Sequence, residues 1–131
     1  MYNKTVMKRF EEAKNAGMIK GADGVGQVGN ARCGDIMRIY LKIENEKIID
    51  AKFKTFGCVS AIASTDIACD MIKGKTLDEA LKVSNKDVVD ALGGLPDIKI
   101  HCSVLAQEAI AEAVKDYRKK QAKLAKTASK K

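Results

Sequence analysis

The sequence has no tryptophan, one proline, one histidine and four cysteines, and each scarcity narrows what the chain can be. Only three Tyr and three Phe are present, so the core has to be built from Ile, Val, Leu, Ala and Met. No apolar run approaches the about 18 residues needed to cross a bilayer, and the amino terminus lacks the basic-then-apolar pattern of a secretory signal. We therefore expect a cytoplasmic protein with no membrane association.

In the reducing cytoplasm, the four cysteines are not expected to hold the fold together as disulfides. Cytosolic cysteines are usually free thiols or metal ligands. A chain of 131 residues with 46% apolar residues can bury a sufficient core without cross-links. We expect one compact α+β domain at 1–118.

The net charge of +7 is concentrated at the carboxyl end. Six of the 24 basic residues lie at 119–131, which contains no acid, so the first 118 residues carry 18 basic against 17 acidic side chains. A run of this kind is usually a solvated, disordered tail, and we favour that interpretation over a nucleic-acid-binding arm.

Period-two alternation predicts two strands, at 37–44 and 49–56, joined by a short polar turn into an antiparallel hairpin. Residues 17–34 contain six glycines, which favours a flexible loop with at most a short edge strand. Helical spacing and capping signals predict helices over 3–16, from Ser60 to Met71, two short ones after Thr76 and Ser84, and a long last one from Ser103.

Three cysteines lie where these elements begin or end. Cys33 comes two residues before Asp35 at the start of the hairpin, Cys58 follows its second strand, and Cys102 follows His101 before the last helix. Helix N-termini stabilise thiolates, so Cys58 and Cys102 are biased toward the form that binds metals or attacks sulfur. The fourth, Cys69, falls at helical spacing from apolar residues and is interpreted as a small core residue.

The gaps between these three cysteines match no zinc-finger spacing. From composition and position alone, a shared metal or cluster site and a set of scattered thiols are equally well supported.

Three motifs together resemble the iron–sulfur cluster assembly scaffold family called IscU or NifU-like. They are ARCGD at 31–35, FKTFGC at 53–58 followed by SAIAS at 60–64, and LPDIKIHCS at 95–103. They occur in the family's order, and the similarity runs from about Thr5 to Lys119. The resemblance implies a three-stranded antiparallel sheet packed against helices, with a nascent 2Fe-2S cluster at one exposed end.

The resemblance also implies roles for particular residues. The family's site positions correspond to Cys33, Asp35, Cys58, His101 and Cys102, with Lys99 at the site lysine. In the family a cysteine desulfurase delivers sulfur as a persulfide, and iron and electrons are added. The implied partners are that desulfurase, a frataxin-like iron donor, a ferredoxin and apo iron–sulfur proteins. The Hsp70 contact made by some relatives is in doubt, because Leu95-Pro96-Asp97 replaces a double-proline segment.

Charge and ligand chemistry favour a carrier over a permanent holder. Two ferric ions and two sulfides held by three thiolates and one carboxylate leave a net charge of about −2, which Lys99 or Lys54 can offset. A fourth ligand of oxygen or imidazole exchanges more readily than a thiolate, so Asp35 or His101 completes the predicted site, with Asp35 preferred. Cys102 is the expected persulfide acceptor, and no turnover of the protein's own is expected.

Other interpretations stay open. The same Cys, Asp and His groups could form a structural zinc site, and zinc could also occupy a scaffold after isolation. A thiol enzyme using His101 and Cys102 is disfavoured, since adjacent side chains at a helix start usually diverge. A nucleic-acid adaptor ranks last. A homo-oligomer is compatible with the sequence.

Overall fold

The computed structural model of the chain describes residues 3–30, 35–55, 59–95 and 100–129. The elements follow the order α1 (Lys4–Glu12), β1 (Gly24–Asn30), β2 (Asp35–Glu44), β3 (Lys47–Thr55), α2 (Val59–Ile72), α3 (Leu77–Leu81), α4 (Asn85–Ala91) and α5 (Ile100–Ser129). The three strands form one antiparallel sheet in the order β1-β2-β3. The predicted α+β architecture with a three-stranded sheet is confirmed.

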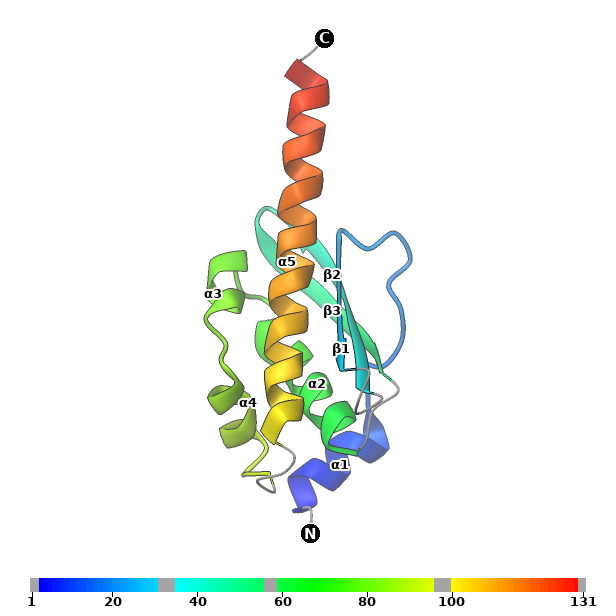
Figure 1. Cartoon of the computed structure of the whole chain (residues 1–131), viewed down its shortest axis with the longest axis vertical. Coiled ribbons are helices and arrows are strands. Elements are labelled where there is room, and N and C mark those ends of the chain that lie inside the picture. Colours follow the sequence, from blue (N-terminus) through cyan, green and yellow to red (C-terminus); the bar gives the residue numbers. More distant parts are fainter. Residues whose placement is uncertain (1–2, 31–34, 56–58, 96–99, 130–131) are drawn as a thin grey trace.

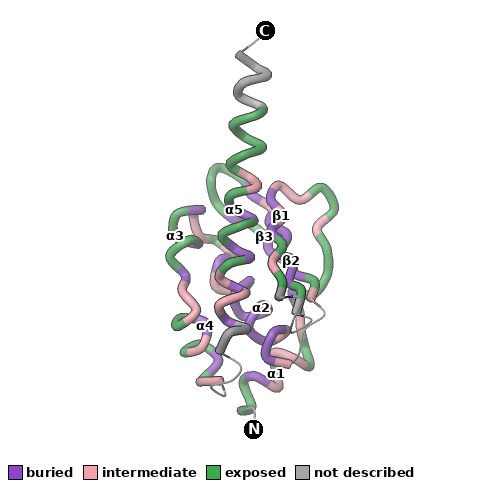
Figure 2. Tube along the Cα trace, in the orientation of Figure 1, coloured by how far each residue is buried: buried purple, intermediate pink, exposed green. Residues whose placement is uncertain are grey.

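The helices cover one face of the sheet, and the core lies between them (Figures 1 and 2). Met37, Ile39 and Leu41 alternate along β2 toward that core, as period-two alternation predicts. Helices α2 and α5 supply mostly alanines and isoleucines to the same cluster. Small side chains allow close packing here, which suits a chain without tryptophan. In the described part of the chain, no helix is long and apolar enough to span a membrane.

The glycine-rich segment forms the edge strand β1, which the sequence pattern allowed only as a short element within a flexible loop. The strand has seven residues, pairs with β2 along its whole length, and lies against α5. A Cβ on Gly24 would stand 2.5 Å from the Ala113 carbonyl oxygen, and one on Gly26 would stand 2.2 Å from that of Ala109. These glycines therefore serve the close approach of strand and helix, rather than the flexibility of a loop.

Replacing Gly26 with alanine should cost about 3 kcal/mol or more of unfolding free energy, because the added methyl group meets backbone atoms that cannot move aside. Urea unfolding measures this cost. The matched control is Gly74→Ala, where φ is +83° and nothing lies within 4 Å, so only the strained backbone, about 1 kcal/mol, is expected. Equal losses in the two variants would contradict the packing role of Gly26.

The helix boundaries shift from those predicted. Helix α1 ends at Glu12 because Ala13 takes a left-handed conformation with φ of 35°, before the glycine expected to end it. Helix α5 begins at Ile100, so Ser103 lies buried inside its first turn instead of capping it. The capping boxes at Thr76 and Ser84 are both formed as predicted.

The tail predicted to be disordered at 119–131 differs as well. Helix α5 continues through Ser129, and its last part projects away from the domain (Figure 1). Lys, Ala, Leu and Gln, which dominate this stretch, all have high helix propensity, so the helix continues after its core contacts end. Helix α5 passes residue 118, the predicted end of the domain, without a break.

Candidate metal centre

The residues predicted to bind a metal are unevenly covered by the structure. Cys33, Cys58 and Lys99 lie outside the described residues. Asp35 is the first residue of β2, and His101 and Cys102 lie in the first turn of α5, with side chains outside the described part. The ends of the strands and helices that carry or adjoin these residues therefore locate the predicted centre.

The end of β1, the start of β2 and the end of β3 lie together at one end of the sheet. The last residue of β1, Asn30, pairs with Asp35 at the start of β2. Thr55, the last residue of β3, pairs with Met37, and its hydroxyl donates to the carbonyl oxygen of Ile36 over 2.6 Å. Cys33 is two residues before Asp35 in the chain, and Cys58 is three after Thr55. The two sequence motifs thus share one end of the sheet.

The N-terminus of α5 reaches the same end. Helix α5 runs antiparallel to β1, since Gly24 meets Ala113 and Tyr117 while Gly26 meets Ala109 and Ala113. From Gly26 to the end of β1, four strand residues span about 13 Å, the rise of about nine helical residues. Counting back from Ala109 leads to the first turn of α5, which carries His101 and Cys102.

The N-terminus of α2 completes this arrangement. Val59, its first residue, is covalently bonded to Cys58. Six residues later, the Thr65 hydroxyl lies 3.0 Å from the Met37 sulfur near the start of β2. Two helix N-termini and three strand ends therefore lie at one end of the molecule (Figure 1). Helix N-termini attract anions, so this end suits thiolates and an anionic cluster.

Among the described residues, no group of three or more His, Cys, Asp and Glu side chains is placed to hold a metal ion. A centre with three such ligands would need at least one residue outside that part of the chain. The predicted ligand set has this property, because it includes Cys33 and Cys58. The assignment of ligands stays a prediction.

The predicted charge-compensating residue Lys54 lies on β3, next to its last residue. It pairs across the sheet with Arg38, whose guanidinium donates to the Gln27 side chain over 2.7 Å. Within the described part of the chain, Lys54 has no ion-pair partner. An unpaired cation near the converging ends could offset negative charge there.

Comparison with known proteins gives a family. Residues 1–124 match the model of the NifU-like N terminal domain. The chain belongs to this family. Membership confirms the resemblance inferred from the three cysteine motifs.

Individual members of the NifU-like N-terminal domain family are similar over most of this chain. The iron–sulfur cluster assembly scaffold protein IscU 1 of Archaeoglobus fulgidus is 50% identical over 124 residues, which cover 95% of this chain and 81% of that protein. The iron–sulfur cluster assembly enzyme IscU of Drosophila melanogaster is 47% identical over 127 residues, covering 94% and 82%.

Solved structures show the same fold. A protein of Fervidobacterium islandicum AW-1, proposed to be an iron–sulfur cluster assembly scaffold for the SUF system, superposes with a TM-score of 0.74. It is 27% identical, and the match covers 86% of this chain and 96% of that one. A NifU-like N-terminal protein from Brucella abortus, at 19% identity and a TM-score of 0.70, shares the fold, with 90% and 94% coverage.

Cys69 is the one cysteine of this chain whose side chain the structure describes, and it lies in the core as predicted. Its side chain is fully buried on α2. Burial, with the nearby Asp66 carboxylate as a second cause, raises the pKa of the Cys69 thiol far above its usual range. This thiol stays protonated and apolar, so it is not available as a ligand.

Ser60 was predicted to cap α2, but the helix begins one residue earlier, at Val59. Ser60 is fully buried, and its hydroxyl has no hydrogen-bond partner among the described residues. Ser64, one turn later, has the same property. Small buried residues at this spacing let neighbouring elements pack closely against the start of α2.

A buried polar network, which sequence reasoning missed, fixes α1 against α2. Arg9 donates to both Asp66 and Asp70, and the Asn15 backbone N–H donates to Asp66 Oδ1 over 2.9 Å. The Asn15 side chain donates to Asp70 over 3.1 Å, and Lys73 donates to Asn15. Asp66 is only 1% exposed, so its charge depends on these partners.

The network gives stability a pH dependence. Partial burial acts to raise the pKa of Asp70, but hydrogen bonds from Arg9, Asn15 and Lys14 outweigh it and bring the pKa down to about 2. The ionised Asp70 side chain therefore stabilises the folded state. This contribution is complete at pH values above about 4, the ordinary pKa of an aspartate, and it is lost as the pH falls toward 2.

Asp70→Asn should therefore lower the unfolding free energy by on the order of 2 kcal/mol at pH 7, and the difference from the natural protein should narrow steadily below pH about 4. Denaturant unfolding across this pH range measures it. Asp90→Asn, at an exposed aspartate, controls for the loss of one negative charge. A difference that stays constant with pH would contradict the role of the Asp70 charge.

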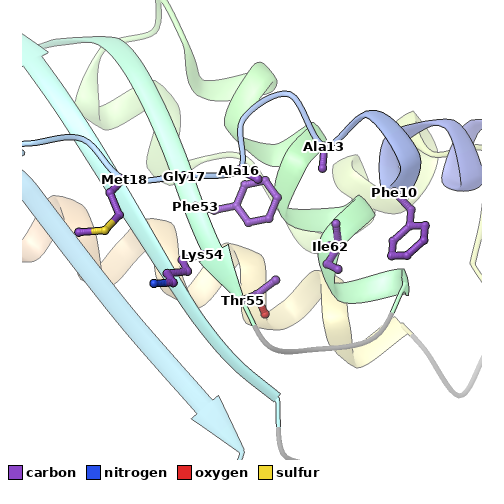
Figure 3. Close-up of a pocket in the computed structure, with 9 residues that line it drawn as sticks. All are labelled: Phe10, Ala13, Ala16, Gly17, Met18, Phe53, Lys54, Thr55 and Ile62. Atoms are coloured by element: carbon purple, nitrogen blue, oxygen red, sulfur yellow. The ribbon is translucent and has the colours of Figure 1, made fainter.

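An apolar recess adjoins the converging ends (Figure 3). It has a volume of about 540 Å³ and lies between the end of α1 and the segment after it, the end of β3, and α2. Its lining residues are Phe10, Ala13, Ala16, Gly17, Met18, Phe53, Lys54, Thr55 and Ile62. Among these described lining residues there is no acid, histidine or thiol, so this part of the recess suits an apolar side chain rather than acid–base chemistry.

Proposed function

We propose that this protein is a scaffold on which an iron–sulfur cluster is assembled. The observation that carries the proposal is the match of residues 1–124 to the NifU-like N terminal domain, with relatives named as scaffolds at about half identity. The convergence of the elements that carry the three cysteine motifs supports it, because a cluster needs its ligands within a few ångströms of one another.

In finer detail, the proposed cargo is a 2Fe-2S cluster. Cys33, Cys58 and Cys102 supply thiolates, and Asp35 supplies the fourth ligand, with His101 as the alternative. Thiolates hold iron firmly, whereas a carboxylate exchanges more readily, which suits a protein that must release its product. Cations at Lys54 and Lys99 lower the cost of gathering this negative charge.

The proposed partners follow from the reaction. A cysteine desulfurase supplies sulfur as a persulfide on Cys102, while an iron donor of the frataxin type and a ferredoxin supply iron and electrons. Apo iron–sulfur proteins receive the cluster. The protein carries its product and turns over no substrate of its own, although one relative bears the name assembly enzyme.

Anaerobic reconstitution tests this function. The protein is incubated with ferrous iron, cysteine and a cysteine desulfurase, and visible absorption is followed before and after addition of an apo-ferredoxin. Sulfide-to-iron charge-transfer bands that move to the ferredoxin are expected. Cys69→Ala is the matched control, because it removes a buried thiol and should leave the bands unchanged.

A structural zinc protein is the competing function. It predicts that no bands form, and that zinc binds tightly and raises the melting temperature through a closed tetrahedral site. That result would overturn the scaffold proposal.

Asp35→Ala should give a protein that loses its cluster more slowly, since the exchangeable oxygen ligand is gone. The decay of the visible bands after addition of a chelator measures the rate. Glu44→Ala removes an exposed carboxylate at the opposite end of the same strand and should leave the rate unchanged. Faster loss from the Asp35 variant would show that the carboxylate holds the cluster.

A further inference from the structure

A second groove lies between α3 and α5, two helices that lie side by side in Figure 1. Its volume is about 510 Å³. The floor is apolar and consists of Leu81, Ala111 and Val114. The rim on α5 consists of three cations, Lys115, Arg118 and Lys119. We call this feature the α3–α5 groove.

The floor contains an apolar side chain that the core does not use. Leu77 and Ala80 of α3 are buried in the core, whereas Leu81 is 37% exposed. A single exposed leucine is ordinary on a protein surface. Here it lies beside Val114, which is buried at the bottom of the groove, so the exposed leucine extends an apolar strip.

The rim is positively charged and only partly neutralised. Arg118 forms an ion pair with Asp78 of α3, with 2.8 Å between Nη2 and Oδ1. Lys115 and Lys119 are exposed, and neither has an ion-pair partner among the described residues. Their spacing of four residues places both on one side of α5. The three cations that line the groove attract negative charge, and Glu112 and Asp116, which line a neighbouring hollow together with Lys115 and Lys119, offset part of that attraction.

We propose that the α3–α5 groove binds an acidic amphipathic helix of a partner protein. Aliphatic side chains on one face of that helix pack on Leu81 and Val114, and carboxylates beside them pair with Lys115 and Lys119. The groove runs along about 12 Å of α5, from Ala111 to Lys119, which matches two turns of a docked helix. Opposite charges guide the encounter, and the apolar floor supplies contact area.

Two other occupants fit the groove less well. A second copy of this chain in the same orientation would bring lysines against lysines. A nucleic acid would use the cations but leave the apolar floor unpaired.

The inference goes beyond the proposed function, because the groove does not include the metal centre. Lys115 lies about 20 Å along α5 from the first turn that carries His101 and Cys102. A partner anchored in the groove therefore leaves that end of the molecule open.

A designed peptide tests the proposal in the full-length protein. The probe is an 18-residue fluorescent peptide of Leu, Glu and Ala, with leucines on one helical face and glutamates flanking them. Fluorescence anisotropy measures its dissociation constant. We expect micromolar binding that weakens about tenfold in the double variant Lys115→Glu/Lys119→Glu and severalfold in Leu81→Ser.

The controls separate the groove from net charge. The double variant Lys4→Glu/Lys8→Glu makes the same charge change at exposed positions of α1 and should bind normally. A peptide of equal composition with its leucines spread around the helix should bind weakly. Amide NMR shifts should map to α3 and to residues 111–119.

Several results would overturn the proposal. These are no binding at millimolar peptide, equal loss in the α1 variant, or shifts confined to residues 123–129, which would mean charge attraction to the projecting helix. Competition by a single-stranded oligonucleotide for the groove would indicate a nucleic-acid site instead. Self-association abolished by Leu81→Ser would indicate a dimer interface.

Discussion

Cys102→Ser should abolish the acceptance of sulfur from a cysteine desulfurase and leave the fold intact. Cys102 is the third residue of α5, within the first turn, where backbone N–H groups lack intrahelical partners and stabilise a thiolate. A serine hydroxyl cannot form a persulfide, so the expected loss is complete. Mass spectrometry of the protein after incubation with desulfurase and cysteine detects the added sulfur.

The fold and the other thiols provide the controls. Circular dichroism and the denaturation midpoint of Cys102→Ser should match those of the natural protein. Cys69→Ala should still accept sulfur, since that thiol is buried and protonated. Undiminished sulfur transfer to the Cys102 variant would refute the assignment and direct attention to Cys33 or Cys58.

Asp66→Ala should lower the unfolding free energy by about 3 kcal/mol. The substitution leaves the buried Asn15 N–H without its acceptor and removes one of the two carboxylates that pair with Arg9. The network attaches α1 to α2, so the chain from Arg9 to Asn15 should loosen first. Guanidinium unfolding gives the free energy, and hydrogen exchange of the α1 amides reports the local effect.

Asp78→Ala is the comparison for this variant. Asp78 also pairs with an arginine, Arg118, but its side chain is 81% exposed, and exposed ion pairs contribute less than about 1 kcal/mol. If Asp66→Ala costs no more than Asp78→Ala, the buried network does not hold α1 in place.

The sequence predicted the parts of the fold that have local signals. Alternation along β2 and β3 gave the hairpin, and the capping residues Thr76 and Ser84 gave two short helices. The full length of strand β1 was not predictable from local signals, because Gly24 and Gly26 meet a helix more than 80 residues later in the chain. The Arg9 network escaped prediction for the same reason, since its partners lie 57 and 61 residues away.

The candidate site was predictable in part. The motifs around Cys33, Cys58 and Cys102 identified the family, and the structure brings the ends of their elements together. Spacing along the chain does not determine which oxygen or nitrogen completes a coordination sphere, because that depends on side-chain geometry. The choice between Asp35 and His101 therefore needs the experiment on cluster loss.

Because β1 packs on α5, the sheet of this chain cannot be fully covered until late in synthesis on the ribosome. The nascent chain emerges from its amino end, so β1 is synthesised long before Ala109 and Ala113, the residues on which Gly24 and Gly26 lie. The pairing of β2 with β3 is local in the sequence, but the inner face of β1 stays uncovered until the last helix emerges. Cys102 is therefore translated before the inner face of β1 is covered, and the predicted ligands can reach their final arrangement only when α5 has been made.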